Sequence, residues 1–183
     1  IPRIMPIQFL NTLSRQLEEF RPLDAAGKLD NVVSDEAAQT FAWLQAVKSA
    51  PYFAHAQFSD TGTMLALPDP GDKFPFIKAM WHYARGIALA QRGERSAAEN
   101  EAQAIAKLDQ TAKFDDVIAW GVPANDVLKV AFHVVQARAA QFASDQAGAV
   151  KSFEAAVAAQ DKLGYMEPPY WYYSVRQSLG AAQ

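Results

Sequence analysis

The sequence feature that most constrains the fold is a pattern of small residues that recurs at an interval of 51 residues. In the first copy, two helix-forming segments meet at Gly93, with Gly86 before the break and Ala98 after it. In the second copy, Ala137 and Ala149 take the places of Gly86 and Ala98. Small side chains at these positions let two antiparallel helices approach closely. The repeat therefore predicts two helical hairpins of the same design.

The two predicted hairpins span residues 74–108 and 126–163. A third copy of the pattern reaches its small residue at Gly180, so residues 168–183 are expected to form the first helix of an incomplete hairpin, begun by the prolines at its start. Residues 1–70 are expected to hold degenerate N-terminal helices. The chain is thus predicted to be one all-α solenoid domain over residues 1–183, cut from a longer solenoid or completed by another molecule.

The N-terminal helices are predicted from local signals. Apolar residues at three-and-four spacing indicate a helix over residues 7–20. Ser34 is a suitable N-cap for the next helix, and Pro51 is expected to begin another. A short helical hairpin is expected around Gly62, and a short helix inside the insertion over residues 110–125. These elements would precede or separate the two repeats.

Composition excludes several classes of function. The formal net charge is -3, which disfavours nucleic acid as a partner because phosphate binding needs a basic surface. No apolar run reaches the length of a membrane span, and the chain has no cysteine for disulfides or thiol chemistry. The compartment stays open between cytoplasm and periplasm. Strands are expected to be nearly absent, since half of the residues are apolar and alanine is abundant.

The repeated hairpins resemble the tetratricopeptide repeat, whose units stack into a right-handed superhelix. More narrowly, MWHYARG at residues 80–86 and EPPYWYYSVRQSLGA at residues 167–181 are similar to a group of bacterial tetratricopeptide-repeat proteins of unassigned function. The resemblance covers the chain from Pro51 onward. It implies binding of a peptide or protein in a concave groove lined by the first helix of each hairpin, without catalysis and without a cofactor.

This groove is the first candidate site. The side chains expected to line it are Tyr83, Ile87, Val134, Arg138, Ser174 and Gln177. Its arginines would be available to a carboxylate of the partner. The aromatic block near the C-terminus consists of Tyr165, Tyr170, Trp171, Tyr172 and Tyr173. It suits two uses, as a recognition surface or as a wedge between hairpins, and we expect both. The full set of expected binding residues is Tyr83, Arg85, Ile87, Arg138, Glu167, Trp171, Tyr172 and Arg176.

The alternative is a small-molecule-binding protein or an enzyme that uses a polar seam between hairpins. Polar residues occupy positions where tetratricopeptide repeats often bury large apolar side chains, and the expected seam contains His82, Arg85, His133, Gln136, Glu167 and Arg176. A buried arginine needs a carboxylate partner, and Glu167 is the first expected partner of Arg85. The simpler interpretation of the seam, which we favour, is a set of hydrogen bonds that only fix the register of the hairpins.

Catalytic and metal-binding motifs are not recognised in the sequence. None of His55, His82 and His133 has a metal ligand at a known helical spacing, so no metal site is predicted. The carboxylates of the second helix, among them Glu101, are expected to lie on a solvated face. The C-terminal helix presents Val175 and other apolar residues with nothing after them to cover them, which predicts self-association through this helix.

Overall fold

The structure is a computed structural model that describes residues 8–11, 16–19 and 33–183. Residues 33–183 form nine helices, so the all-α class is confirmed for this part of the chain. The helices are α2 (Asp35–Thr40), α3 (Leu44–Phe58), α4 (Thr61–Leu65), α5 (Pro75–Gln91), α6 (Arg95–Thr111), α7 (Asp115–Ala119), α8 (Ala124–Phe142), α9 (Gln146–Gln160) and α10 (Val175–Ala182). The expected short helix in the insertion is α7.

The helix predicted over residues 7–20 is wrong where the structure describes this segment. Strands β1 (Gln8–Asn11) and β2 (Gln16–Glu19) pair antiparallel instead, with Leu10 opposite Leu17. The leucine spacing that suggested one helical face also suits a hairpin in which the two leucines are cross-strand partners. The other parts of the predicted helix, residue 7, residues 12–15 and residue 20, lie outside the described residues.

The two hairpins α5–α6 and α8–α9 occupy the ranges that the repeat predicted, and their turns are built alike. Gly93 has a φ of 75° and Ser144 has a φ of 58°, so each turn passes through one left-handed residue. The amide of Glu94 donates to the Leu89 carbonyl and the amide of Asp145 donates to the Ala140 carbonyl, both at 2.9 Å. These pairs are 51 residues apart, so the sequence repeat is a repeat of turn geometry.

Small residues mark the close contacts between helices. Ala98 and Ala149 are fully buried at the interfaces within the hairpins. Gly86 faces both its own hairpin and the next one, because a Cβ atom built on it would lie 2.6 Å from Val135 Cγ1 of α8 and 3.4 Å from Glu101 Cβ of α6. The core therefore runs continuously through both hairpins, with Tyr83 and Val135 fully enclosed in it.

Of the two helix starts predicted in this region, one is confirmed and one is wrong. Ser34 does cap α2, and its hydroxyl accepts a hydrogen bond from the Ala37 amide. Pro51, however, lies inside α3 and does not begin a helix. Proline in a helix removes one backbone donor. Side-chain packing of α3 against α5, in which Phe53 meets Tyr83, keeps the helix continuous across this position.

The C-terminal prediction is wrong about the start of the last helix. Pro168 follows a cis peptide bond, and the chain from Gly164 to Ser174 is not helical, so α10 begins only at Val175. The prediction that this helix has an uncovered apolar edge is also wrong. Val175 and Ala182 are fully buried, and Leu179 is packed against the core. The shorter helix lies on α9, and this contact covers the face that was expected to be open.

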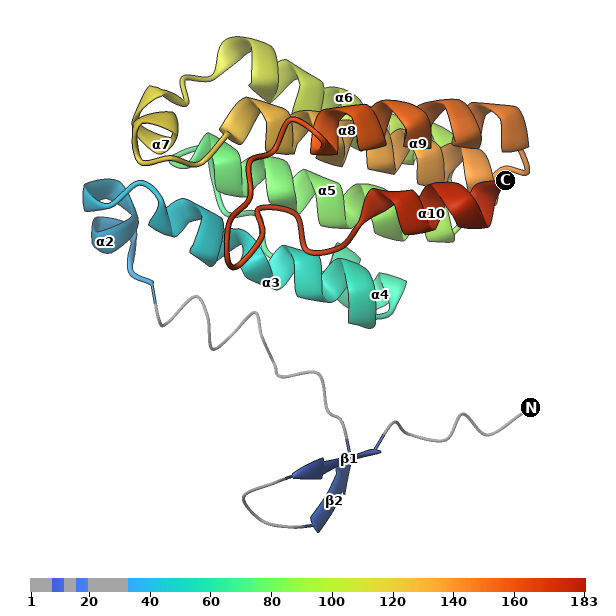
Figure 1. Cartoon of the computed structure of the whole chain (residues 1–183), viewed down its shortest axis with the longest axis horizontal. Helices are drawn as coiled ribbons and strands as arrows, with labels where there is room; N and C mark the ends of the chain where they lie inside the picture. The colour runs from blue at the N-terminus through green and yellow to red at the C-terminus, as the bar shows by residue number, and fades with distance from the viewer. Residues whose placement is uncertain (1–7, 12–15, 20–32) are drawn as a thin grey trace.

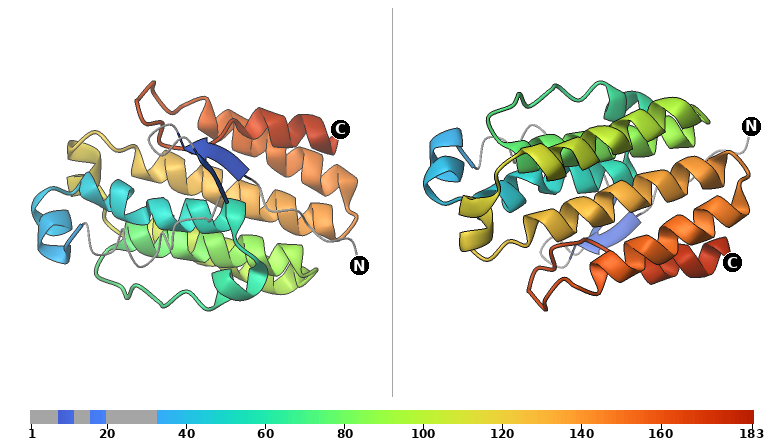
Figure 2. Two further views of the ribbon diagram at one scale, coloured as in Figure 1. Left: turned by 90° about the horizontal axis from the view of Figure 1, so that it is seen from below. Right: turned by 90° about the horizontal axis from the view of Figure 1, so that it is seen from above.

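The helices are arranged in tiers (Figure 1). Helices α6, α8 and α9 form the upper tier in that view, α5 and α10 lie below them, and α3 and α4 lie at the bottom of the helical part. Seen from below in Figure 2, α3 lies over α5 and α8, and α10 lies at the opposite edge of α8 and α9. Helices α5 and α8 thus provide a floor between α3 and α10.

Candidate functional site

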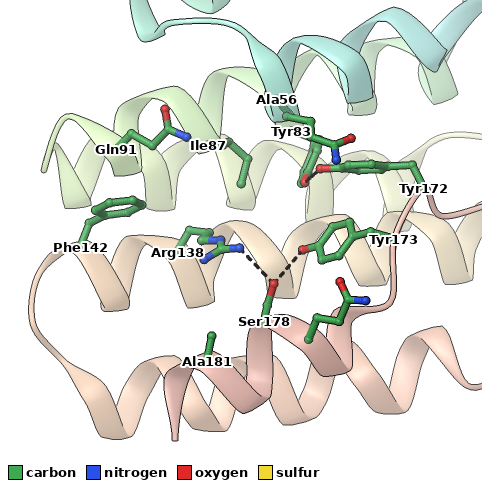
Figure 3. A pocket seen from close by; sticks show the side chains of 12 residues that line it. Ala56, Tyr83, Ile87, Gln91, Arg138, Phe142, Tyr172, Tyr173, Ser178 and Ala181 are labelled. Atoms are coloured by element: carbon green, nitrogen blue, oxygen red, sulfur yellow. Dashed lines mark hydrogen bonds between the residues drawn. The ribbon is translucent and has the colours of Figure 1, made fainter. Parts of the chain in front are cut away.

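A pocket of about 470 Å³ lies on this floor (Figure 3). Its lining comes from α3, α5, α8, α10 and the segment before α10. The lining residues are Ala56, Gln57, Tyr83, Ile87, Gln91, Arg138, Phe142, Tyr172, Tyr173, Gln177, Ser178 and Ala181. The volume is within the range of natural ligand pockets, about 300–1,000 Å³.

Helical periodicity explains the floor. Tyr83, Ile87 and Gln91 are spaced four residues apart on α5 and therefore lie on one face of the helix. Arg138 and Phe142 have the same spacing on α8. Tyr83 and Ile87 are buried, whereas Phe142 is 48% exposed, so the pocket changes from enclosed to open along the two helices. The floor therefore combines apolar surface with one cation.

The wall opposite α3 is made by α10. Gln177, Ser178 and Ala181 line the pocket from this helix, and Figure 3 shows the last two. Because Ser178 and Ala181 are small, they leave room above Arg138. On the other side, Ala56 and Gln57 contribute from the last turns of α3. Both walls thus pair a small residue with a glutamine amide, which can donate and accept hydrogen bonds.

An aromatic cluster closes one end of the pocket. Trp171 is 2% exposed, and its ring centroid lies 5.3 Å from that of Phe53 and 5.1 Å from that of Tyr83. Tyr172 stacks on Phe53 at 4.9 Å, and its hydroxyl lies 2.8 Å from the Tyr83 hydroxyl. The aromatic block thus serves packing and pocket lining together. The division is possible because Trp171 and Tyr172 lie in a bent, non-helical segment.

The tyrosines of this cluster are held in their neutral form. Burial raises the pKa of Tyr83 well above its ordinary value, and the nearby Tyr172 adds to the effect. Burial also raises the pKa of Tyr172, against a smaller opposing effect of the hydrogen bond with Tyr83. Both hydroxyls therefore act as neutral hydrogen-bonding groups at physiological pH.

Arg138 is the one charged residue of the lining. Its Nη1 donates to Gln141 Oε1 at 2.7 Å and its Nη2 donates to Ser178 Oγ at 3.0 Å, and its Cζ lies 5.2 Å from the centroid of the Phe153 ring. Within the described part of the chain, no carboxylate lies within ion-pair distance of this guanidinium. The pocket therefore has a net positive charge.

The predicted polar seam does not assemble as expected. Arg85 pairs with Glu101 and not with Glu167, with Nε 2.9 Å from Glu101 Oε1. His82 Nδ1 lies 2.6 Å from the other oxygen of the same carboxylate. Glu167 instead accepts a hydrogen bond from the exposed Tyr165 hydroxyl. Glu167 is separated from Arg85 because its segment bends and does not begin a helix.

Two further seam residues also lie apart. Arg176 forms a two-bond ion pair with Asp161 on the exposed surface, at 2.6 and 2.7 Å. His133 is half-buried, and burial lowers its pKa against an opposing hydrogen bond with Gln136. Arg85 itself is partly buried, lies over the Trp81 ring and donates to the Leu65 carbonyl. The group around Glu101 thus fastens α4, α5 and α6 together.

Sequence reasoning missed Glu101 because it was assigned to a solvated face. Burial raises its pKa, but the hydrogen bonds from His82 and Arg85 outweigh burial and hold the pKa below its ordinary value. The side chain is 14% exposed. Its position three residues after the buried Ala98 was the available signal, since residues at this spacing share a helix face.

Of the eight predicted binding residues, the structure brings four together in the pocket: Tyr83, Ile87, Arg138 and Tyr172. Trp171 lies directly behind them in the core, and Val134 of the expected groove is fully buried. Ser174 is exposed outside the lining, while Gln177 is in it. The residues that sequence reasoning missed include Gln57 of α3, because a pocket wall from a preceding helix has no sequence signature.

Comparison of this chain with protein-family models, with curated proteins and with solved structures gives no match. Among residues 8–11, 16–19 and 33–183, no group of three or more histidine, aspartate or glutamate side chains is placed to hold a metal ion. Within the same ranges, no helix combines the length and the apolar character that crossing a membrane requires. The geometry of the pocket is therefore the feature that points to a function.

Proposed function

We propose that this chain is a binding module of the tetratricopeptide-repeat type, a right-handed superhelix of helical hairpins that holds a peptide or protein partner in a groove. The groove is the pocket between α3 and α10, with α5 and α8 as its floor. The observation that carries the proposal is the lining itself, which combines residues from both hairpins, among them Ile87 and Arg138, with residues of α10.

The chemistry of the lining supports binding. It contains three tyrosines, three glutamines, one serine and one arginine, and it contains no histidine, carboxylate or lysine that could act as an acid or base near neutral pH. Tyrosine provides a large rigid contact surface, and glutamine amides pair with the backbone groups of a bound chain. The exposed ring of Phe142 extends this surface at the open end.

The second function considered from the sequence, a small molecule or a reaction at the polar seam, receives no support from the geometry. Glu101 already satisfies His82 and Arg85, while Glu167 and Arg176 lie elsewhere on the surface. Self-association through α10 is likewise not part of the proposal, because the apolar residues of this helix are covered by the rest of the chain.

The proposal is tested by filling the groove with a bulky side chain. Ala181→Trp introduces a large ring into the pocket from α10, and Ala158→Trp introduces the same ring at another exposed helical alanine, on α9 and outside the lining. Each chain is probed on an array of random-sequence peptides, and folding is checked by circular dichroism. We expect the native chain and Ala158→Trp to bind a common set of peptides that Ala181→Trp no longer binds. The same set bound by all three chains would contradict the proposal.

A further inference from the structure

We infer that the partner presents an acidic side chain, the carboxylate of an aspartate or glutamate, to Arg138. The inference rests on the proposed function and adds the chemical class of the residue that the groove recognises. Arg138 lies at the floor of the pocket between α8 and α10 (Figure 3), where a side chain entering above the small residues Ser178 and Ala181 reaches it.

The pairing of the other arginines shows that Arg138 is an exception. The structure describes five arginines, and four of them form ion pairs with carboxylates of the chain: Arg85, Arg92, Arg95 and Arg176. Arg138 alone among these five has only neutral acceptors, Gln141 and Ser178. In a chain with a net charge of -3, an arginine that faces a pocket without a carboxylate is a site of unmatched charge.

The hydrogen-bonding capacity of Arg138 is only partly used. A guanidinium has five N–H donors, and two of its nitrogens donate to the described protein atoms. A carboxylate accepts in a bidentate manner, and such charge-assisted bonds are about twice as strong as bonds to neutral groups. A bound carboxylate would therefore compete effectively with the Gln141 amide, and the Ser178 hydroxyl lies close enough to turn and donate to it.

A purely structural role of Arg138 would have different consequences from a binding role. Arg138 also joins α8 to Ser178 of α10 and to the Phe153 ring of α9, so it could serve only as a brace. A brace that is lost lowers stability without changing selectivity for charge. If Arg138 is only a brace, a carboxylate placed next to its guanidinium would strengthen the contact between the helices. If Arg138 binds the partner, the same carboxylate would occupy the guanidinium and block binding. Ser178→Asp makes this distinction, because Ser178 Oγ lies 3.0 Å from Arg138 Nη2.

The test uses three pools of random hexapeptides with acetylated N-termini. The first has glutamate at one interior position and an amidated C-terminus, the second has glutamine at that position, and the third has glutamine and a free C-terminal carboxylate; acidic residues are left out elsewhere. Binding is followed by fluorescence anisotropy and by the amide signals of Ile87 and Ser178. The chains compared are native, Arg138→Gln, Ser178→Asp and, as the charge control, Arg176→Gln, which removes an exposed arginine outside the lining.

We expect the glutamate pool to half-saturate the native chain and Arg176→Gln at about tenfold lower concentration than the glutamine pool. The difference should vanish in Arg138→Gln and in Ser178→Asp, and Ser178→Asp should melt no lower than the native chain. Equal binding of the glutamate and glutamine pools would overturn the inference and leave the groove function standing. Preference for the third pool would overturn it by assigning the carboxylate to a chain end, and binding of no pool would contradict the groove function as well.

Discussion

A close helix contact leads to a quantitative prediction at Gly86. A Cβ atom at this position would lie 2.6 Å from Val135 Cγ1 and 3.0 Å from Val135 Cγ2. Distances below 3.0 Å do not occur between packed carbon atoms, so one of the two helices must shift. Valine cannot relieve the clash by rotation, because its branched side chain has one preferred χ1 in a helix. Gly86→Ala should therefore strain the α5–α8 interface.

Two opposing effects set the magnitude. Alanine is favoured over glycine in a helix interior by about 1 kcal/mol. Overpacking of a filled core costs about 1–3 kcal/mol. We expect the clash to win and Gly86→Ala to lose up to about 2 kcal/mol, which lowers the melting temperature by up to about 4–8 °C in a domain of this size. Urea unfolding followed by circular dichroism measures the free energy directly.

Gly180 provides the matched control. It also lies in a helix, but a Cβ atom built on it meets nothing within 4 Å. Gly180→Ala should be neutral or stabilise the chain by a few tenths of a kcal/mol, since the position is in a terminal turn. Val135→Ala in the Gly86→Ala background should cost about 1 kcal/mol less than in the native chain. If Gly86→Ala is as stable as Gly180→Ala, the contact does not limit the approach of the helices.

Three further predictions follow from buried polar and aromatic groups. Glu101→Gln should lower the unfolding free energy by about 1–3 kcal/mol at pH 7. Because the folded-state pKa of Glu101 is below the ordinary 4.5, the difference in unfolding free energy from the native chain should shrink as the pH falls below 4.5. Urea unfolding at pH 7 and at pH 3.5 would measure this change. Tyr83 and Tyr172 have raised pKa values, so the native chain should lose stability as the pH rises above about 10, and absorbance titration should find these two un-ionised while the fold persists. Trp171→Ala should cost about 3–5 kcal/mol, whereas Trp171→Phe should cost clearly less, since the buried indole N–H has no partner among the described residues and its loss breaks no hydrogen bond.

The hairpins could be predicted from the sequence because their contacts recur. Gly93 and Ser144 are the left-handed residues of the two hairpin turns, and the sequence itself shows their equivalence as a 51-residue interval. The groove face of α5 followed from the four-residue spacing of Tyr83 and Ile87. Local periodicity and small-residue spacing are properties of single helices, so they can be read directly from the sequence.

The polar partners could not be predicted in the same way. Arg85 meets Glu101 across a hairpin. Glu167 was predicted in its place, and that prediction depended on the path of the chain after α9. The helix prediction for the N-terminal segment was wrong for a related reason. Leu10 and Leu17 satisfy both a helical period and a cross-strand pairing, and a pattern shared by two structures does not choose between them.

The failed prediction for the last helix explains why a pocket exists. A helix from Pro168 would have continued the repeat and placed the aromatic residues around its own circumference. The chain instead stays non-helical through Ser174, so Trp171 reaches the core between α3 and α5 while Tyr172 and Tyr173 turn toward the pocket. Helix α10 then begins late enough to form a wall opposite α3. The departure from the repeat therefore supplies one end and one wall of the site in which Arg138 lies without a carboxylate.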